Sequence, residues 1–164
     1  RWTDGGDLVP LAEQDRSRWD TAVIAEGVTI LQGALTRDRL GEYQAQAAIA
    51  ALHCDAASAE ETDWPQILEW YDELLRLTGS PVVALNRAVA VGQVDGPLAG
   101  LRALDAVAPD VPRRTAVAAW LHERAGDRRT AATLFAQAAA SAGNVAERNH
   151  LTRQAARLGQ ELQS

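Results

Sequence analysis

The chain has 164 residues, of which 47% are hydrophobic and 23% charged, and this composition predicts one soluble domain or one short array of repeats. It contains no Met and no Lys, so all 16 basic residues are Arg, which excludes a Gly-Lys-Ser/Thr phosphate loop, a Schiff-base lysine and a pyridoxal-phosphate anchor. The net charge of −6 is uneven, since residues 1–110 hold 8 Arg against 18 acidic side chains and residues 111–164 hold 8 Arg against 4. An acidic surface of this extent repels phosphate backbones, so the chain by itself is not expected to bind nucleic acid. Two interpretations of the asymmetry remain open, a solvated surface or a surface for electrostatic docking.

Side chains that commonly carry catalysis or bind metal are few. The single cysteine, Cys54, cannot form an internal disulfide, and together with the three His residues it gives no zinc-site spacing. Neighbouring helical residues point about 100° apart, so His53 is poorly placed to activate Cys54 as a nucleophile. No apolar run approaches the roughly 20 residues that span a bilayer, and residues 1–10 do not form a signal peptide. We expect a cytoplasmic domain, cut from a longer protein because Met is missing, with no enzymatic activity, cofactor or metal.

An abundance of Ala, Leu, Arg, Glu and Gln, with almost no alternating apolar pattern, predicts an all-α fold of seven or eight helices over residues 1–164. Several helix starts are marked by side chains that can satisfy the unpaired amides of a first turn. In chain order, these signals are Ser17 with Asp20, Asp63 with Gln66, Ser80 with Pro81, and Asn144 with Glu147. Short breaks centred on Gly, Asp or Pro separate the helices, so neighbouring helices are expected to pack as antiparallel hairpins.

The helix expected over residues 40–56 is apolar on nearly every side. This pattern predicts a helix sandwiched between neighbours. Its polar exceptions are Gln44, Gln46 and His53.

A repeat is indicated by Gly92 and Gly126, which stand 34 residues apart and are each expected to end an apolar helix before a turn containing Asp. That spacing is the tetratricopeptide period. Small or aromatic residues occupy the positions where this repeat needs them, at Ala119, Ala131, Phe135 and Ala138, whereas His122 and Gly143 replace its usual aromatic and proline. The pattern predicts a tetratricopeptide-like α-α superhelix. With no strand before them, Gly92, Gly96 and Gly100 are expected to serve turns and close helix packing, not a phosphate site.

Two groups of side chains are candidates for a contact surface, and each has a structural alternative. Trp and Arg are typical of interface hot spots, and both occur in the cluster Asp15, Arg16, Trp19 and Asp20. The same cluster also suits a capped helix in which the Trp side chain staples the first turn. Trp64 is expected at the margin of its helix, where it can seal a groove between hairpins or meet a partner.

Asn86 and Arg87 interrupt the most apolar helix of the chain. Burial of an unpaired guanidinium would cost several kcal/mol, so an acidic partner is expected for Arg87. The candidates for that partner are Asp72, Glu73 and Asp20. An internal ion pair that organises the hairpins is favoured over a ligand site.

Five stretches of the chain, in this order, resemble a known family. They are Leu-Ala-Glu-Gln-Asp-Arg-Ser-Arg-Trp-Asp (11–20), Gly-Glu-Tyr-Gln-Ala-Gln-Ala-Ala-Ile-Ala-Ala-Leu-His (41–53), Thr-Asp-Trp (62–64), Ser-Pro-Val-Val-Ala-Leu-Asn-Arg-Ala-Val-Ala-Val (80–91) and Gly-Pro-Leu-Ala-Gly-Leu (96–101). The set resembles the C-terminal extension of bacterial extracytoplasmic-function (ECF) sigma factors, in the group whose extension contains tetratricopeptide-like repeats. The resemblance covers nearly the whole chain, and its most specific part is the block at residues 80–91.

The resemblance implies a non-enzymatic regulatory domain that follows two helical sigma domains, which are absent from this chain. It implies contacts with those sigma domains or with core RNA polymerase, and contact with DNA only through the absent domains, with no membrane involved. We expect the contact surface to draw on the polar and aromatic candidates above: Asp15, Arg16, Trp19, Asp20, Gln44, Gln46, His53, Trp64, Asn86 and Arg87. Two other functions stay open, a free-standing tetratricopeptide-like scaffold that binds peptides and a small-molecule sensor with a polar pocket.

Overall fold

The structure is a computed structural model that describes residues 41–163 except residues 57, 59 and 60. Seven helices lie in this part of the chain, which contains no strand. They are α2 (Glu42–Asp55), α3 (Trp64–Thr78), α4 (Pro81–Val94), α5 (Pro97–Asp105), α6 (Arg114–Arg124), α7 (Arg128–Ser141) and α8 (Val145–Glu161). The prediction of an all-α fold is confirmed.

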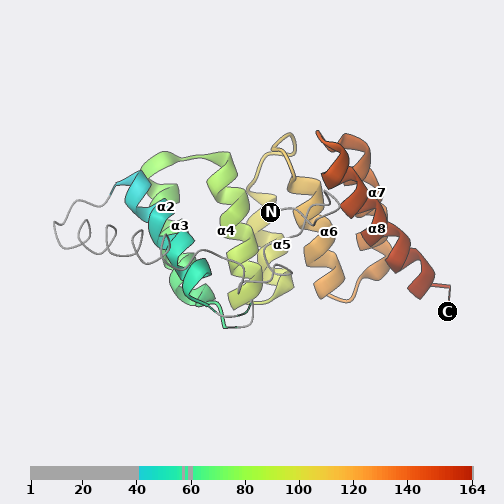
Figure 1. The fold of residues 1–164 in the computed structure, drawn as a ribbon, viewed down its shortest axis with the longest axis horizontal. Helices are drawn as coiled ribbons and strands as arrows, with labels where there is room; N and C mark the ends of the chain where they lie inside the picture. The colour runs from blue at the N-terminus through green and yellow to red at the C-terminus, as the bar shows by residue number, and fades with distance from the viewer. Residues whose placement is uncertain (1–40, 57, 59–60, 164) are drawn as a thin grey trace.

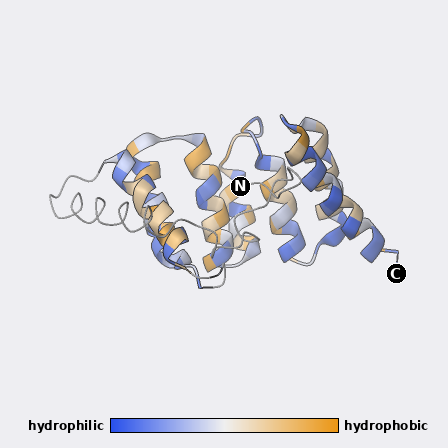
Figure 2. Ribbon diagram, in the orientation of Figure 1, coloured by the Kyte–Doolittle hydropathy of each residue, from blue (hydrophilic) through white to orange (hydrophobic). Residues whose placement is uncertain are grey.

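The helices follow one another along a row, from α2 and α3 at one end to α7 and α8 at the other, and each packs against the next (Figure 1). α4 also contacts α6, so α4, α5 and α6 all pack against one another. Hydrophobic residues form three successive clusters along the row, centred on Ile67, Leu121 and Leu158. Apolar residues are prominent along α3 and α4, whereas α8 is largely hydrophilic (Figure 2). The core is therefore divided among neighbouring helices and is not gathered at one centre.

Two of the sequence-predicted helix starts are confirmed with their capping bonds. The Asp63 carboxylate accepts a hydrogen bond from the Gln66 amide at 3.0 Å, and the Asn144 side chain accepts one from the Glu147 amide at 2.8 Å. Ser80 occupies the predicted N-cap position of α4, but its hydroxyl makes no capping bond. The predicted start at Ser17 lies outside the described residues.

Glycines allow α4 and α5 to cross closely. A Cβ atom on Gly100 would lie 2.9 Å from the Gly92 Cα atom and 2.6 Å from Leu121 Cδ2, which is too close for either contact. Gly96, at the N-cap of α5, has a φ of +89°, a conformation that favours glycine. The prediction that these glycines serve a turn and close packing is confirmed.

The predicted 34-residue equivalence of Gly92 and Gly126 is wrong. Gly92 is buried inside α4, whereas Gly126 follows α6 with a φ of +84°. A shift of 31 residues instead relates the buried positions Gly100, Leu104 and Val107 to Ala131, Phe135 and Ala138. The same shift relates the N-caps of α5 and α7. The prediction from glycine spacing failed because Gly92 lies at a helix crossing, whereas Gly126 lies in a turn.

The prediction that the helix at residues 40–56 is sandwiched can be followed on one side alone, because residues 1–40 lie outside the described part of the chain. α2 packs against α3 and buries Ala45, Ala48 and Ile49, whereas Tyr43 is 83% exposed.

None of the helices in residues 41–163, the three gaps aside, is long and apolar enough to cross a membrane.

Candidate functional site

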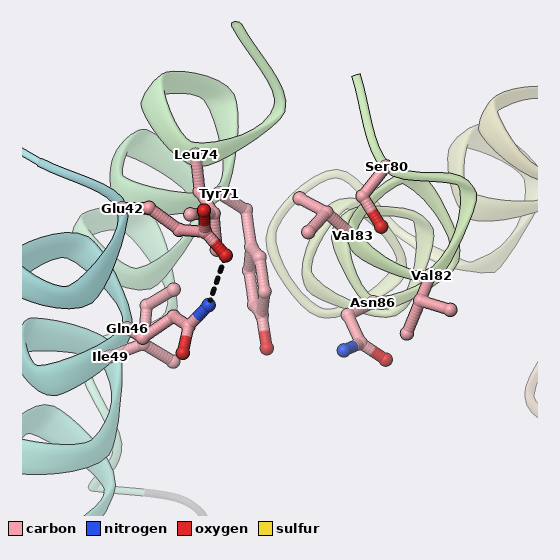
Figure 3. Close-up of a pocket in the computed structure, with 9 residues that line it drawn as sticks. All are labelled: Glu42, Gln46, Ile49, Tyr71, Leu74, Ser80, Val82, Val83 and Asn86. Atoms are coloured by element: carbon pink, nitrogen blue, oxygen red, sulfur yellow. Dashed lines mark hydrogen bonds between the residues drawn. The ribbon is translucent and has the colours of Figure 1, made fainter. Parts of the chain in front are cut away.

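An open cleft of about 290 Å³ lies where α2, α3 and the first turns of α4 meet (Figure 3). Its walls combine apolar and polar side chains from all three helices: Glu42, Gln46, Ile49, Tyr71, Leu74, Ser80, Val82, Val83 and Asn86. Ile49, Leu74 and Val83 are buried members of the first hydrophobic cluster. The cleft thus has a floor continuous with the core and a polar rim.

The α2 side of the rim is formed by Glu42 and Gln46. These residues lie one helical turn apart, and Gln46 Nε2 donates a hydrogen bond to Glu42 Oε1 at 3.1 Å. A carboxylate can only accept hydrogen bonds, so the contact fixes which end of the Gln46 amide faces Glu42. The Gln46 oxygen is thereby turned away from Glu42 (Figure 3).

Tyr71 lies between the lining side chains of α2 and those of α4 (Figure 3). Burial raises the pKa of Tyr71 above its ordinary value, because the anionic phenolate would lose solvation. The hydroxyl is therefore protonated at neutral pH and can both donate and accept a hydrogen bond.

The α4 side of the cleft is formed by Ser80, Val82 and Asn86. The Ser80 hydroxyl is not used in capping, and Asn86 is exposed one turn after Val82, which is 53% exposed. The Ser80 backbone amide is satisfied separately, by donating to Thr78 Oγ1 at 3.2 Å. Ser80 and Asn86 thus present polar side chains beside the apolar Val82 and Val83.

An ion pair between Arg87 and Asp72 flanks the cleft, and these two residues directly follow Asn86 and Tyr71 in the chain. Arg87 Nε donates to Asp72 Oδ1, so the prediction of an acidic partner for Arg87 is confirmed, and Asp72 is the partner among the three candidates. The pair is not internal as predicted, because the two side chains are 33% and 52% exposed. Glu73 instead pairs with Arg76 at 2.6 Å, and this hydrogen bond lowers the pKa of the Glu73 carboxyl.

The surroundings of the cleft are acidic. Residues 41–110 contain 3 Arg against 11 Asp and Glu side chains. Two of these three Arg side chains, Arg76 and Arg87, are held in the ion pairs just described. A cation approaching this half of the row therefore meets a net negative potential.

The structure brings only Gln46 and Asn86 of the sequence-predicted contact residues to the cleft. Gln44 instead accepts a hydrogen bond from the Gly41 amide and so caps its own helix. His53 and Trp64 form a separate edge-to-face pair, with ring centroids 5.3 Å apart. The remaining cluster, Asp15, Arg16, Trp19 and Asp20, lies outside the described residues.

Three polar lining residues were not predicted as contact residues. They are Tyr71, Glu42 and Ser80, the last of which was assigned to helix capping. The spacing of four residues between Glu42 and Gln46 indicates that they can pair on one helix. That this pair lies opposite Asn86 depends on how α2 and α4 each pack against α3. Among the described residues no cluster of three or more His, Cys, Asp or Glu side chains could hold a metal ion.

Comparison with known proteins adds two matches. Residues 1–35 match the model of a family of unknown function, DUF6596, and these residues lie outside the described part of the chain. An uncharacterized protein of Rhizobium meliloti (strain 1021) is 48% identical over 101 residues, which is 62% of this chain and 24% of the relative. The chain thus spans about a quarter of the length of that curated relative. No solved structure matches the chain significantly.

Proposed function

We propose that this chain is the regulatory C-terminal domain of an ECF sigma factor, acting in the cytoplasm through contacts with its own sigma domains or with core RNA polymerase. The observation that supports the proposal most strongly is which parts of the sequence form the walls of the cleft. The stretches at 41–53 and 80–91, which resemble the sigma-factor extensions, form α2 and α4. Seven of the nine lining residues come from these two stretches.

The architecture supports a role in protein contact. A row of helical hairpins in which each packs on its neighbours gives an extended surface, and such rows are used as binding surfaces in other helical-repeat proteins. The acidic character of residues 41–110 favours docking on a basic protein surface and disfavours direct contact with DNA.

The cleft is small for a metabolite site. Its volume of about 290 Å³ falls just below the roughly 300–1,000 Å³ of pockets that enclose drug-sized ligands. It is also not enclosed. Both properties favour a protein segment over an enclosed small molecule.

Transcription in vitro tests the proposal. Core RNA polymerase is combined with the whole proposed sigma factor that contains this chain, or with a version that ends before Asp4 and so lacks this domain. Promoter output and polymerase binding are then measured. We expect the truncation to change promoter output several-fold. Unchanged output together with unchanged polymerase binding would refute the regulatory role.

A point variant places the effect at the cleft. Asn86→Ala in the full-length protein is expected to shift promoter output in the same direction as the truncation. The matched control is Gln93→Ala, which changes a polar residue of α4 that does not line the cleft. Equal output from the two variants would mean that regulation uses another surface.

A further inference from the structure

The polar rim of the cleft is biased toward hydrogen-bond acceptors on the α2 side. The Gln46 amide donates one hydrogen bond to Glu42, and its carbonyl oxygen is a further acceptor on this side. The Glu42 carboxylate adds acceptor capacity and a full negative charge at the rim. Tyr71 lies beside them, and its hydroxyl can supply a further acceptor (Figure 3). A ligand with several donors in one plane satisfies this arrangement.

The remaining surfaces of the cleft suit a side chain with an apolar stem and a flat cationic head. Ile49, Leu74 and Val83 form an apolar floor beneath the rim. The Tyr71 ring stands upright in the cleft, where it offers a face for stacking (Figure 3). A guanidinium group stacks on aromatic rings and carries five donors, whereas an ammonium group is a compact, strongly hydrated point charge.

Charge decides between a cation and an anion. The N-terminus of α4 carries about half a positive charge, and this would attract a carboxylate to the Ser80 side of the cleft. A carboxylate placed there would face the full negative charge of Glu42 on the opposite wall, within a half of the row that holds 11 acidic side chains against 3 Arg. The balance therefore favours a cation.

We infer that the cleft is a binding site for the arginine side chain of a basic peptide segment. The guanidinium lies against Tyr71 and donates to the Glu42 carboxylate, while the methylene stem covers the apolar floor. The inference goes beyond the proposed function, because it concerns the chemistry of the cleft and does not depend on which protein supplies the segment.

The test is fluorescence anisotropy with the full-length protein and a labelled eight-residue peptide of alternating Arg and Ala. A second peptide carries citrulline in place of each Arg, which keeps the shape and removes the charge, and a third carries Glu. We expect the Arg peptide to bind about tenfold more tightly than the citrulline peptide, as for the loss of one charge-assisted hydrogen bond. The Glu peptide is expected not to bind.

Protein variants tie the binding to the cleft. Glu42→Gln is expected to weaken the Arg peptide about tenfold. Glu69→Gln makes the same change of net charge at an exposed position of α3 outside the cleft, and is expected to leave binding unchanged. Thermal melts of both variants check that the fold is retained, and Tyr71→Leu, which removes the stacking face, provides a second perturbation of the same site.

The inference is overturned if the citrulline peptide binds as tightly as the Arg peptide, or if the Glu peptide binds in preference to both. It is also overturned if Glu42→Gln and Tyr71→Leu, both folded, bind the Arg peptide as the unchanged protein does. Because the readout is direct peptide binding, none of these results bears on whether truncation alters transcription, so the two proposals fail separately.

Discussion

Gly100→Ala adds one methyl group where α4 and α5 lie closest. The new Cβ atom would sit 2.9 Å from the Gly92 Cα atom, 3.1 Å from the Ala88 carbonyl oxygen and 2.6 Å from Leu121 Cδ2. Two of these neighbours are backbone atoms, so the clash cannot be relieved by a side-chain rotation alone. Leu121 is fully buried and has little room to turn. The two helices must therefore move apart.

The cost follows from two opposing effects. Overpacking a core costs about 1–3 kcal/mol, and a clash with backbone belongs in the upper part of that range. Replacing Gly by Ala inside a helix gains about 0.5–1 kcal/mol. The expected net loss is about 1–2 kcal/mol, which lowers the melting temperature of a chain of this length by about 2–8 °C.

The assay is urea unfolding followed by circular dichroism, with Gly159→Ala as the matched control. Gly159 lies in α8, and a Cβ atom there would meet nothing within 4 Å, so this change should stabilise the protein by about 0.5–1 kcal/mol. A double-mutant cycle with Leu121→Ala gives a second measure. We expect Leu121→Ala to cost less in the Gly100→Ala background, by about 1 kcal/mol, because the added methyl fills part of the space that Leu121 vacates.

The close crossing would be refuted if Gly100→Ala proved as stable as Gly159→Ala. An additive double-mutant cycle would show that Gly100 and Leu121 do not share the same space.

Three further predictions concern the second half of the row. Asn144→Ala removes the side chain that caps α8 and should lower the free energy of unfolding by about 1 kcal/mol, whereas Asn144→Asp should retain the cap; equal losses in urea melts would contradict this. Arg157→Gln breaks the 2.6 Å contact with Glu123 between α8 and α6, and because both side chains are partly exposed the loss should be at most about 1 kcal/mol and should fade in 1 M salt. The hydrogen bonds from Thr130 lower the pKa of the Asp127 carboxyl, so its stabilising contribution is present above the unfolded pKa of about 3.9 and is lost as pH falls through the lower folded value. Asp127→Asn keeps a capping side chain but cannot titrate, so it should be less stable than the unchanged protein at pH 7 and equal to it at about pH 2; a constant difference across that range would refute the assignment.

Helix caps were predictable from the sequence, because the two groups that interact lie close together in the chain. The caps at Asp63 and Asn144 depend on side chains three residues from the amides they accept from, and both were predicted. The partner of Arg87 was narrowed to three acids because an unpaired guanidinium on so apolar a helix is costly, and Asp72 is one of them.

Properties that depend on how helices pack were not predictable. Ser80 has the residue type and the position of a cap, yet its hydroxyl lies at the cleft instead. Tyr71 follows the spacing of core residues in its helix and packs against the first hydrophobic cluster, but the cleft opens beside it, so it also forms a wall. The cleft itself arises from the relative placement of α2 and α4 on either side of α3, and no local pattern encodes that placement.

The row of helices also has a mechanical property. A change in the angle between α3 and α4, at one end, would be multiplied by the length of the row and become a larger displacement at α8 (Figure 1). Since the hydrophobic clusters are divided among successive neighbours, such a rotation needs only one of them to repack. A segment bound between α2 and α4 would thereby displace the opposite, Arg-rich end of the row.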